Sequence, residues 1–316
     1  ALSIGADGTL CFNTSADQML SGAITGSGDL VKQGTGELTI TGANSSFGGD
    51  AVLSGGELTL QNTDALGTGS LSQTDGSSTL IFDNTGTFDN DLSIFNVRFL
   101  QDVILSGNII ANNNTYDVVS GETTVSGDIT SANNDDGPSG GTTKTGAGTL
   151  ILSGTNTYVG ATDVQVGTLR AGADTTVFGN NSATTVATGA FLQLNGFSSN
   201  SIGSLAGAGT VENASATAAT LTTGGDNTST TFSGVLQDGT GGGALSLTKV
   251  GTGTQTLSGA NTYTGGTTLN TGTLVLGSAS AAGTGTITQT SGIGTSTLRL
   301  NTGGTITNDI SLFNLE

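Results

Sequence analysis

Short apolar stretches with a period of two residues recur along the whole chain. The stretches at 38–40, 57–60, 149–152 and 273–276 alternate Leu, Ile or Val with Thr, and each is followed by Gly, Gln, Ser or Thr. This alternation is typical of β-strands with one buried face. No segment carries a sustained i, i+3, i+4, i+7 apolar stripe with helix caps. The pattern therefore predicts an all-β chain with almost no helix.

Three longer segments share one pattern, at residues 31–60, 143–172 and 248–277. Each contains a Lys, a G-x-G that begins two residues later, a strand-like run and an Asn whose separation from the Lys is the same in all three copies. The recurring Lys residues are Lys32, Lys144 and Lys249, and the recurring Asn residues are Asn44, Asn156 and Asn261. Self-similarity over such long spacings is typical of repeat architectures.

The first and third copies continue to match downstream, where residues 78–96 align with residues 296–314. The sequence therefore holds one long unit and the opening part of a second. It ends at Glu316 in strand-like text. We expect the native chain to continue, or further coils or chains to stack end to end on this coil, because an uncapped coil exposes unpaired backbone groups.

Small side chains decide between two all-β architectures. Gly supplies 54 of the 316 residues, and aromatic residues make up 4%. A β-sandwich fills its core with bulky side chains from two facing sheets. A parallel β-solenoid needs only a narrow core, because its coils stack ~4.8 Å apart. We expect one elongated β-helix domain over residues 1–316, with coils of about 20–25 residues and a protruding loop at 131–142 that holds Pro138.

Two strings of this chain resemble the autotransporter-associated β-strand repeat, also called the passenger-associated transport repeat. They are GAGTLILSGTNTYVGATDVQVGTLRAG and GTGTQTLSGANTYTGGTTLNTGTLVLG. The resemblance implies a right-handed parallel β-helix from the passenger of a type V secreted protein of Gram-negative bacteria. It also implies export to the cell surface at the outer membrane, and such passengers often act as adhesins, some of them in virulence.

The first copy departs from this pattern at one corner. Phe47 lies three residues after Asn44, whereas Tyr158 and Tyr263 each lie two residues after the recurring Asn. We expect these aromatic side chains to pack inside the corner. The recurring Asn residues are expected to satisfy corner backbone groups or to adopt a left-handed conformation. The recurring Lys residues are expected to pack their stems along a coil edge and keep their ammonium groups in water, and Cys11 is expected to be buried.

Charge and missing residue types exclude several functions. The net charge of −18 and the isoelectric point near 4.1 disfavour nucleic acid and anionic lipid as partners. The chain has no His and one Cys. This composition excludes Ser-His-Asp and Cys-His catalysis, His-ligated metals, a disulfide framework and cysteine zinc sites. No cofactor or metal site is expected, and no apolar run reaches the ~18 residues of a membrane span.

Four local patterns resemble functional motifs but lack the context that each motif requires. Residues 137–141 fit G-x-S-x-G and residues 239–244 fit G-x-G-x-x-A, yet neither precedes a helical pattern. The acidic group at 133–136 lacks the spacing of a calcium loop. Asp89 and Asp91 would share one face of a regular strand, but Thr307 replaces one of them in the matching segment. We expect loops and corners here, and no enzyme active site.

The favoured function is a non-catalytic structural or adhesive rod whose repetitive wall of Thr, Ser and Asn binds another copy, a glycan or a host protein. A second hypothesis is a spacer and secretion or folding platform for a binding domain elsewhere. A polysaccharide-active β-helix enzyme would need acids and cations close together, and the chain has six Lys and Arg residues in all. Ice binding would need T-x-T at equal coil spacing, which the irregular spacing does not provide.

Overall fold

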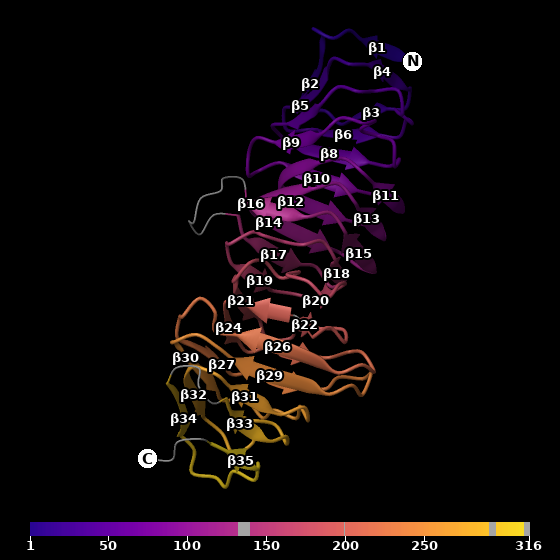
Figure 1. The fold of residues 1–316 in the computed structure, drawn as a ribbon. Helices are drawn as coiled ribbons and strands as arrows, with labels where there is room; N and C mark the ends of the chain where they lie inside the picture. Colours follow the sequence, from indigo (N-terminus) through magenta and orange to yellow (C-terminus); the bar gives the residue numbers. More distant parts are fainter. Residues whose placement is uncertain (132–139, 199, 291–294, 313–316) are drawn as a thin grey trace. The chain divides into compact units, whose positions relative to one another are not determined.

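The structure is a computed structural model that describes residues 1–131, 140–198, 200–290 and 295–312. The chain divides into two compact units, unit 1 at residues 1–154 and unit 2 at residues 155–316. Every strand pairing in the described ranges is parallel, and no described residue is helical. The expected all-β parallel β-helix is therefore confirmed, and Figure 1 shows the strands of successive coils side by side within each unit. One continuous domain over residues 1–316 stays a prediction.

Unit 1 stacks its strands in three columns. One column holds β2 (Thr9–Asn13), β5 (Asp29–Gln33), β7 (Ala51–Leu53), β9 (Leu71–Gln73), β12 (Leu92–Phe99), β14 (Ile109–Val118) and β16 (Ile129–Ser131). The second holds β3 (Gln18–Leu20), β6 (Glu37–Ile40), β8 (Glu57–Leu60), β10 (Thr79–Phe82), the later parts of β12 and β14, and β17 (Thr142–Thr145). The third holds β11 (Gly86–Phe88), β13 (Val103–Leu105), β15 (Glu122–Val125) and β18 (Thr149–Leu152), while β1 (Leu2–Ile4) pairs with β4 (Ile24–Gly26).

Unit 2 also has three columns. One contains β19 (Thr162–Val164), β21 (Ala183–Val186), β24 (Ser204–Gly207), β27 (Thr230–Phe232), β30 (Thr254–Leu257), β32 (Gly272–Leu276) and β34 (Ser296–Leu300). Another contains β20 (Thr168–Ala171), β22 (Phe191–Gln193), β25 (Thr210–Glu212) and β28 (Val235–Gln237). The last contains β23 (Asn200–Ile202), β26 (Ala219–Thr223), β29 (Leu245–Lys249), β31 (Thr267–Leu269), β33 (Ile287–Gln289) and β35 (Ile310–Ser311).

The strand register shows that coil length varies along the chain. Glu37 pairs with Glu57, whereas Leu80 pairs with Val97 across a shorter coil. Asn114 pairs with Thr142 across a much longer coil, whose additional residues lie between β16 and β17. This is the position of the loop expected at 131–142. Residues 132–139 lie outside the described residues, so protrusion of that loop stays a prediction.

The core is narrow and is filled by one inward side chain from every second strand position. In β6 and β18 the burial alternates residue by residue, with Leu or Ile inward and Thr, Glu or Ile on the other face. Phe82, Phe88 and Phe99 pack together inside unit 1, with ring centroids 4.6 Å apart for Phe82 and Phe88 and 5.3 Å apart for Phe82 and Phe99. Few large side chains are needed because each coil covers the next.

Cys11 is exposed, so the expectation that it is buried is wrong. It lies in the middle of β2, between Leu10 and Phe12. Successive side chains of a strand point to opposite faces. With Leu10 and Phe12 on the less exposed face, Cys11 must point outward. It joins Val31 on the same outer column.

Candidate functional site

The recurring Lys residues lie inside the coils, with their ammonium groups bonded to the backbone. The side chains of Lys32, Lys144 and Lys249 are at most 2% exposed. Lys32 Nζ donates hydrogen bonds to the carbonyl oxygens of Gln33 at 2.8 Å, Gly34 at 3.0 Å and Gly55 of the next coil at 2.9 Å. The expectation of an ammonium group in water is therefore wrong. Corner carbonyls that turn inward replace the water around the charge.

The other two Lys residues repeat this arrangement. Lys144 Nζ donates to the carbonyl oxygens of Thr145 at 2.5 Å and Gly146 at 2.8 Å. Lys249 Nζ donates to those of Val250 at 2.5 Å, Gly251 at 3.0 Å and, in the next coil, Thr271 at 3.4 Å. We call this arrangement the lysine cage: one ammonium group held by the carbonyls of the two residues that follow it, with a third from the next coil at Lys32 and Lys249.

The glycine two residues after each Lys makes the cage geometrically accessible. Gly34, Gly146 and Gly251 have φ values of +72°, +75° and +69°. These are left-handed conformations that glycine adopts without steric cost. A Cβ atom at Gly146 would also lie 2.2 Å from the carbonyl oxygen of Val118 in the preceding coil. The K-x-G spacing of the repeat thus encodes the turn that directs the carbonyls toward the ammonium group.

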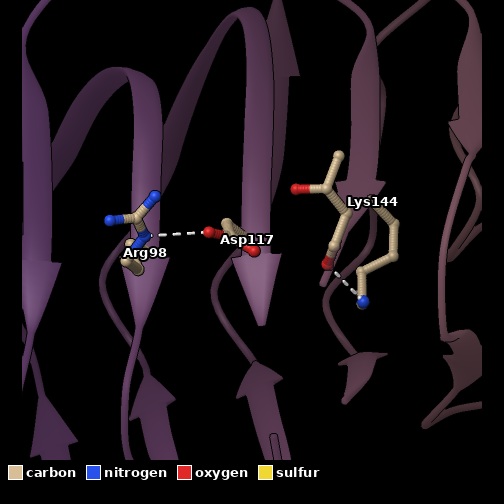
Figure 2. Close-up of polar contacts among 4 residues, drawn as sticks. Arg98, Asp117 and Lys144 are labelled. Atoms are coloured by element: carbon tan, nitrogen blue, oxygen red, sulfur yellow. Dashed lines mark hydrogen bonds and ion pairs between the residues drawn. The ribbon is translucent and has the colours of Figure 1, made fainter. Parts of the chain in front are cut away.

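Burial changes the acid–base properties of the caged ammonium groups. Desolvation lowers the pKa of Lys32, Lys144 and Lys249, and that of Lys144 falls to about 8. The carboxylate of Asp117 in the neighbouring strand opposes part of the shift at Lys144, since it raises the pKa. Asp117 also forms an ion pair with Arg98, in which Arg98 Nε lies 2.9 Å from Asp117 Oδ2. Figure 2 shows the Arg98–Asp117 pair beside Lys144, whose amine bends back toward the backbone.

The side chains of the recurring Asn residues form hydrogen bonds to backbone groups of adjacent coils. Asn44 is fully buried, and its Oδ1 accepts a 2.8 Å hydrogen bond from the backbone N–H of Ile24 in the preceding coil. Its Nδ2 donates to the carbonyl oxygen of Ala65 in the following coil at 2.7 Å. Asn261 makes the same two bonds, from Leu236 N at 2.8 Å and to Ala281 O at 2.5 Å.

Asn156 makes the second of these two bonds, since its Nδ2 donates to the carbonyl oxygen of Val177 at 2.6 Å. None of the three is among the non-glycine residues with positive φ, which are Asn113, Asn181, Asn195 and Asn227 in the described ranges. Of the two expectations for these residues, satisfaction of corner backbone groups is confirmed and the left-handed conformation is wrong.

The aromatic residues that follow each Asn pack inside the corner, as expected. Tyr158, Tyr263 and Phe47 are all fully buried. The hydroxyl of Tyr263 lies 2.6 Å from Thr267 Oγ1, and that of Tyr158 lies 2.8 Å from Thr162 Oγ1. Burial raises the pKa of Tyr263 to about 12.

The first copy loses both members of the buried hydroxyl pair together. Phe47 has no hydroxyl, and the residue at the start of the strand that follows is Ala51, where the other copies have Thr162 and Thr267. A lone buried hydroxyl would be costly. The paired change from Tyr and Thr to Phe and Ala avoids that cost, and it accompanies the one-residue shift of the aromatic position.

Two further buried side chains were not identified from the sequence. Gln73 fills a corner two coils after Lys32, where its Oε1 accepts the N–H of Phe95 at 2.6 Å and its Nε2 donates to Ser78 O at 3.0 Å. Gln289 lies two coils after Lys249 and donates to Ser296 Oγ at 2.7 Å. The sequence did contain a signal for these residues. The segments around Gln73 and Gln289 resemble each other, and their separation along the chain is almost the same as that of Lys32 and Lys249.

The motif-like segments show no assembled active site where they are described. Asp89 and Asp91 lie outside the strands, at an exposed corner. Asp89 accepts a hydrogen bond from Ser106 Oγ and Asp91 accepts one from the N–H of Asn108 at 2.7 Å. Residues 239–244 lead into β29, so the helix of a dinucleotide site is absent. Residues 133–136 and most of the G-x-S-x-G segment at 137–141 lie outside the described residues.

Unit 1 has an open hollow of about 290 Å³ on the outer face of its third column. Its lining residues are Gly86, Asp102, Val103, Ile104, Glu122 and Thr124. Ile104 is the middle residue of β13 and points outward between two buried neighbours, and it is 43% exposed. We call this hollow the β13–β15 groove.

Unit 2 has a polar ladder on the outer face of its β20–β22–β25–β28 column. Arg170, Gln193, Glu212 and Gln237 are in register across the four strands. Arg170 Nε donates to Gln193 Oε1, and the amides of Gln193 and Gln237 donate to the two oxygens of Glu212, each at 2.7 Å. The side chains of this face bind one another, which keeps Glu212 only 7% exposed.

The described residues hold no group of three or more His, Cys, Asp or Glu side chains with the geometry of a metal site. In the same ranges, no helix is long and apolar enough to cross a membrane. The described residues thus offer outer walls, the β13–β15 groove and buried polar side chains as candidate functional features.

Comparison with known proteins links these features to a family. The sequence profile of the passenger-associated-transport-repeat matches residues 30–60, 143–171 and 247–276. The three expected repeat copies are confirmed to within one residue at each end. No solved structure matches the chain.

One relative spans most of the chain. It is the adhesin BmaC autotransporter of Brucella suis biovar 1 (strain 1330), which is 32% identical over 276 residues, or 84% of this chain. The chain spans about 7% of the length of that relative. The relative supports the family over the parts of the chain that lie between the repeat copies. By its repeats, its parallel coils and this similarity, the chain belongs to the autotransporter passengers that carry the passenger-associated-transport-repeat.

Proposed function

We propose that this chain is a non-catalytic adhesive segment of its passenger, acting at the bacterial cell surface against a cell or host surface. The observation that carries the proposal is the 32% identity to an autotransporter named as an adhesin, over 84% of the chain. Exported passengers of this family are exposed at the cell surface, which is where an adhesive segment acts.

Inward side chains stabilise the coils and outward side chains are free to differ from coil to coil, which supports this proposal. The recurring residues Lys32, Asn44 and Tyr263 are buried and bind their own backbone or a neighbouring side chain. They build the coils and do not reach a partner. Recognition therefore belongs to outward residues that differ from coil to coil, such as those around the β13–β15 groove.

A second candidate function is a secretion and folding platform. The three profile matches contain the lysine cages and the recurring Asn residues, which hold the coils together. A segment that folds readily once exported would also display a binding domain elsewhere in the passenger. Self-association of the segment stays a prediction.

Adhesion of coated particles distinguishes these two functions. Beads carrying residues 1–316 are added to cultured host cells, and bound beads are counted against beads carrying a heat-unfolded sample. Adhesion by the folded chain supports the adhesive function. Absence of adhesion, together with loss of passenger export when Lys144→Met is introduced into the full protein, would assign the platform function instead.

A further inference from the structure

We propose that the outer face of the β20–β22–β25–β28 column in unit 2 binds a neutral, extended glycan. This inference rests on the adhesive function proposed above, and it names the class of ligand and the surface that binds it. Its basis is an outward aromatic side chain, the polar ladder beside that side chain and the balance of charge on this face.

One outward column of this face is apolar at two of its four positions. Thr168, Phe191, Thr210 and Val235 are in register across the four strands, and each is partly exposed. Leu192 follows Phe191 and is fully buried, so the Phe191 ring points outward. An outward aromatic ring offers a flat apolar surface on which the C–H face of a sugar ring can stack.

Small neighbours leave the Phe191 ring accessible. Gly189 lies two residues before it, and a Cβ atom built there would meet no atom within 4 Å beyond its chain neighbours. In the next coil Thr210 pairs with Phe191, and the exposed Ala208 lies two residues before Thr210. Val166, in the coil before, is 49% exposed. The ring thus borders an open surface that a ligand can reach.

The polar ladder supplies hydrogen-bonding groups next to that ring. Gln193 lies two residues after Phe191 and therefore on the same face of the sheet. The ladder uses one N–H of each Gln amide, in the bonds to the two oxygens of Glu212. Among the described residues, the second N–H of each amide and Oε1 of Gln237 have no partner. Sugar hydroxyls both donate and accept, so they match this mixture of donors and acceptor.

The bonds within the ladder hold these groups in place before a ligand arrives. Arg170 fixes the carbonyl end of Gln193, and Glu212 fixes the amide ends of Gln193 and Gln237. Fixing long side chains in advance lowers the entropic cost of binding. The strand register also places the four side chains in one row with a spacing of ~4.8 Å. A row of this kind suits an extended chain of sugar rings.

The charge of this face favours a neutral ligand. Arg170 and Glu212 carry opposite charges within one hydrogen-bonded row. Residues 155–316 contain 7 acidic and 3 basic residues, a net charge of −4, within a chain of net charge −18. An acidic glycan is therefore repelled. A basic ligand gains little, because Glu212 is bonded on both oxygens and only 7% exposed.

The third column of unit 1 does not offer the same chemistry. Its strands β11, β13, β15 and β18 contain no Asn or Gln, and their one aromatic residue, Phe88, is buried. The side chains in register on its outer face are Thr87, Ile104 and Thr124. That face lacks both the aromatic ring and the amides, so the proposal is specific to unit 2.

The test attaches a maleimide dye to Cys11, the single Cys of the chain, which is exposed in unit 1. Binding of the whole chain is measured on surfaces coated with cellotetraose, which is neutral and extended, maltotetraose, which is neutral and curved, or tetragalacturonate, which is acidic. We expect saturable binding to cellotetraose only. Phe191→Thr and Gln237→Thr should each weaken binding about three- to tenfold, since each removes one stacking or hydrogen-bonding contact. Thr fits at position 191 because Thr168 and Thr210 flank it in register.

Matched controls separate this face from the rest of the chain. Ile104→Thr removes an exposed aliphatic side chain of unit 1, and Gln61→Thr removes an amide that donates to the Asp83 carboxylate at 2.8 Å. Both should leave binding unchanged. Equal weakening by the controls, equal binding to maltotetraose or tetragalacturonate, or no binding to cellotetraose would overturn the proposal. Self-association of the unliganded chain that Phe191→Thr abolishes would assign this face to a second copy and would also overturn it.

Nuclear magnetic resonance of the wild-type chain tests the site without any substitution. Added cellotetraose should shift the side-chain amide signals of Gln193 and Gln237 and leave that of Gln61 unchanged. Unchanged signals at both ladder residues would overturn the proposal. This measurement decides the question even where a variant fails to fold.

The bead assay separates this proposal from the function on which it rests. If wild-type beads adhere and Phe191→Thr beads adhere equally well, the glycan-binding face is wrong and the adhesive function stands. If wild-type beads do not adhere, the adhesive function fails, while the coated surfaces still decide whether this face binds cellotetraose.

Discussion

The lysine cage explains why a strongly acidic chain places all its Lys residues in its interior. A turn of the backbone in each repeat leaves carbonyl oxygens pointing inward, away from water and without a strand partner. Unpaired buried carbonyls cost free energy. An ammonium group has three donors and satisfies up to three of them at once, as Lys32 does with Gln33, Gly34 and Gly55. The charge is therefore a structural component of the corner.

The low pKa of Lys144 predicts a rise in stability at alkaline pH. The folded-state pKa of about 8 lies below the ordinary value of 10.5. Between these pH values the unfolded chain holds a proton that the folded chain has released, so the free energy of unfolding rises with pH, by about 3 kcal/mol. Guanidinium unfolding at pH 7.5 and pH 10.5 measures this rise. The rise should be smaller in Lys144→Met, and an equal rise in that variant would contradict the assignment.

The buried hydroxyl pair predicts a coupling between Tyr263 and Thr267. Tyr263→Phe leaves the Thr267 hydroxyl buried without its partner and should cost about 1–2 kcal/mol of unfolding free energy. Adding Thr267→Ala removes the orphaned group. We expect the double variant to be about 1 kcal/mol more stable than the sum of the two single changes indicates, in a denaturant-based double-mutant cycle. Phe47 and Ala51 are the natural form of this double variant, and strict additivity would exclude the coupling.

At the scale of the strand and its corner, the side chains of the recurring Asn residues supply hydrogen bonds between coils that a strand would otherwise supply. Where the backbone of a coil turns away from its neighbours, the Asn261 amide accepts from Leu236 in the coil before and donates to Ala281 in the coil after. The ladder of hydrogen bonds between coils therefore continues through a side chain. One residue type with a donor and an acceptor on a short stem meets this need, which Asp and Leu do not.

Asn261→Ala should release the middle of β28 before the rest of unit 2. The change leaves the Leu236 N–H and the Ala281 carbonyl buried and unpaired, at a cost of about 2–4 kcal/mol for the two groups. Hydrogen exchange should show faster exchange at Leu236 than in the wild-type chain. Asn301→Ala, at an exposed position, is the matched control and should change nothing. Unchanged exchange at Leu236 would show that the amide bridge carries no stability.

Period and spacing predicted the elements, but not the direction of every side chain. The alternation in β6 and β18 and the corner glycines were sufficient for a parallel β-helix with a narrow core. The spacing from Lys to Asn located the repeats. It did not show that the ammonium points inward, because that depends on carbonyls of the next coil such as Gly55. The hollow is lined by residues of three successive coils, such as Gly86, Ile104 and Thr124, and no local pattern reports that they line one surface.

At the scale of the whole molecule, the two units differ in charge far more than in architecture. Both stack parallel strands in three columns, yet residues 1–154 carry a net charge of −14 and residues 155–316 carry −4. In unit 1, Glu37 and Glu57 are in register on adjacent strands, about 4.8 Å apart along the stack. Carboxylates in register on adjacent strands repel each other in the folded state more than in the unfolded chain.

Added salt should therefore stabilise unit 1 more than unit 2. Ions at 0.5 M screen charges beyond roughly 4–5 Å, so they relieve repulsion between coils of unit 1. Hydrogen exchange of the whole chain in 20 mM and 500 mM NaCl should show a larger gain in protection for peptides from residues 1–154 than for those from 155–316. Glu57→Gln should reduce the gain around β6 and β8, because it removes one of the two facing carboxylates. Sodium sulfate strengthens apolar burial in both units, so a gain that is equal in both units with NaCl would show general salting-out and contradict the charge argument.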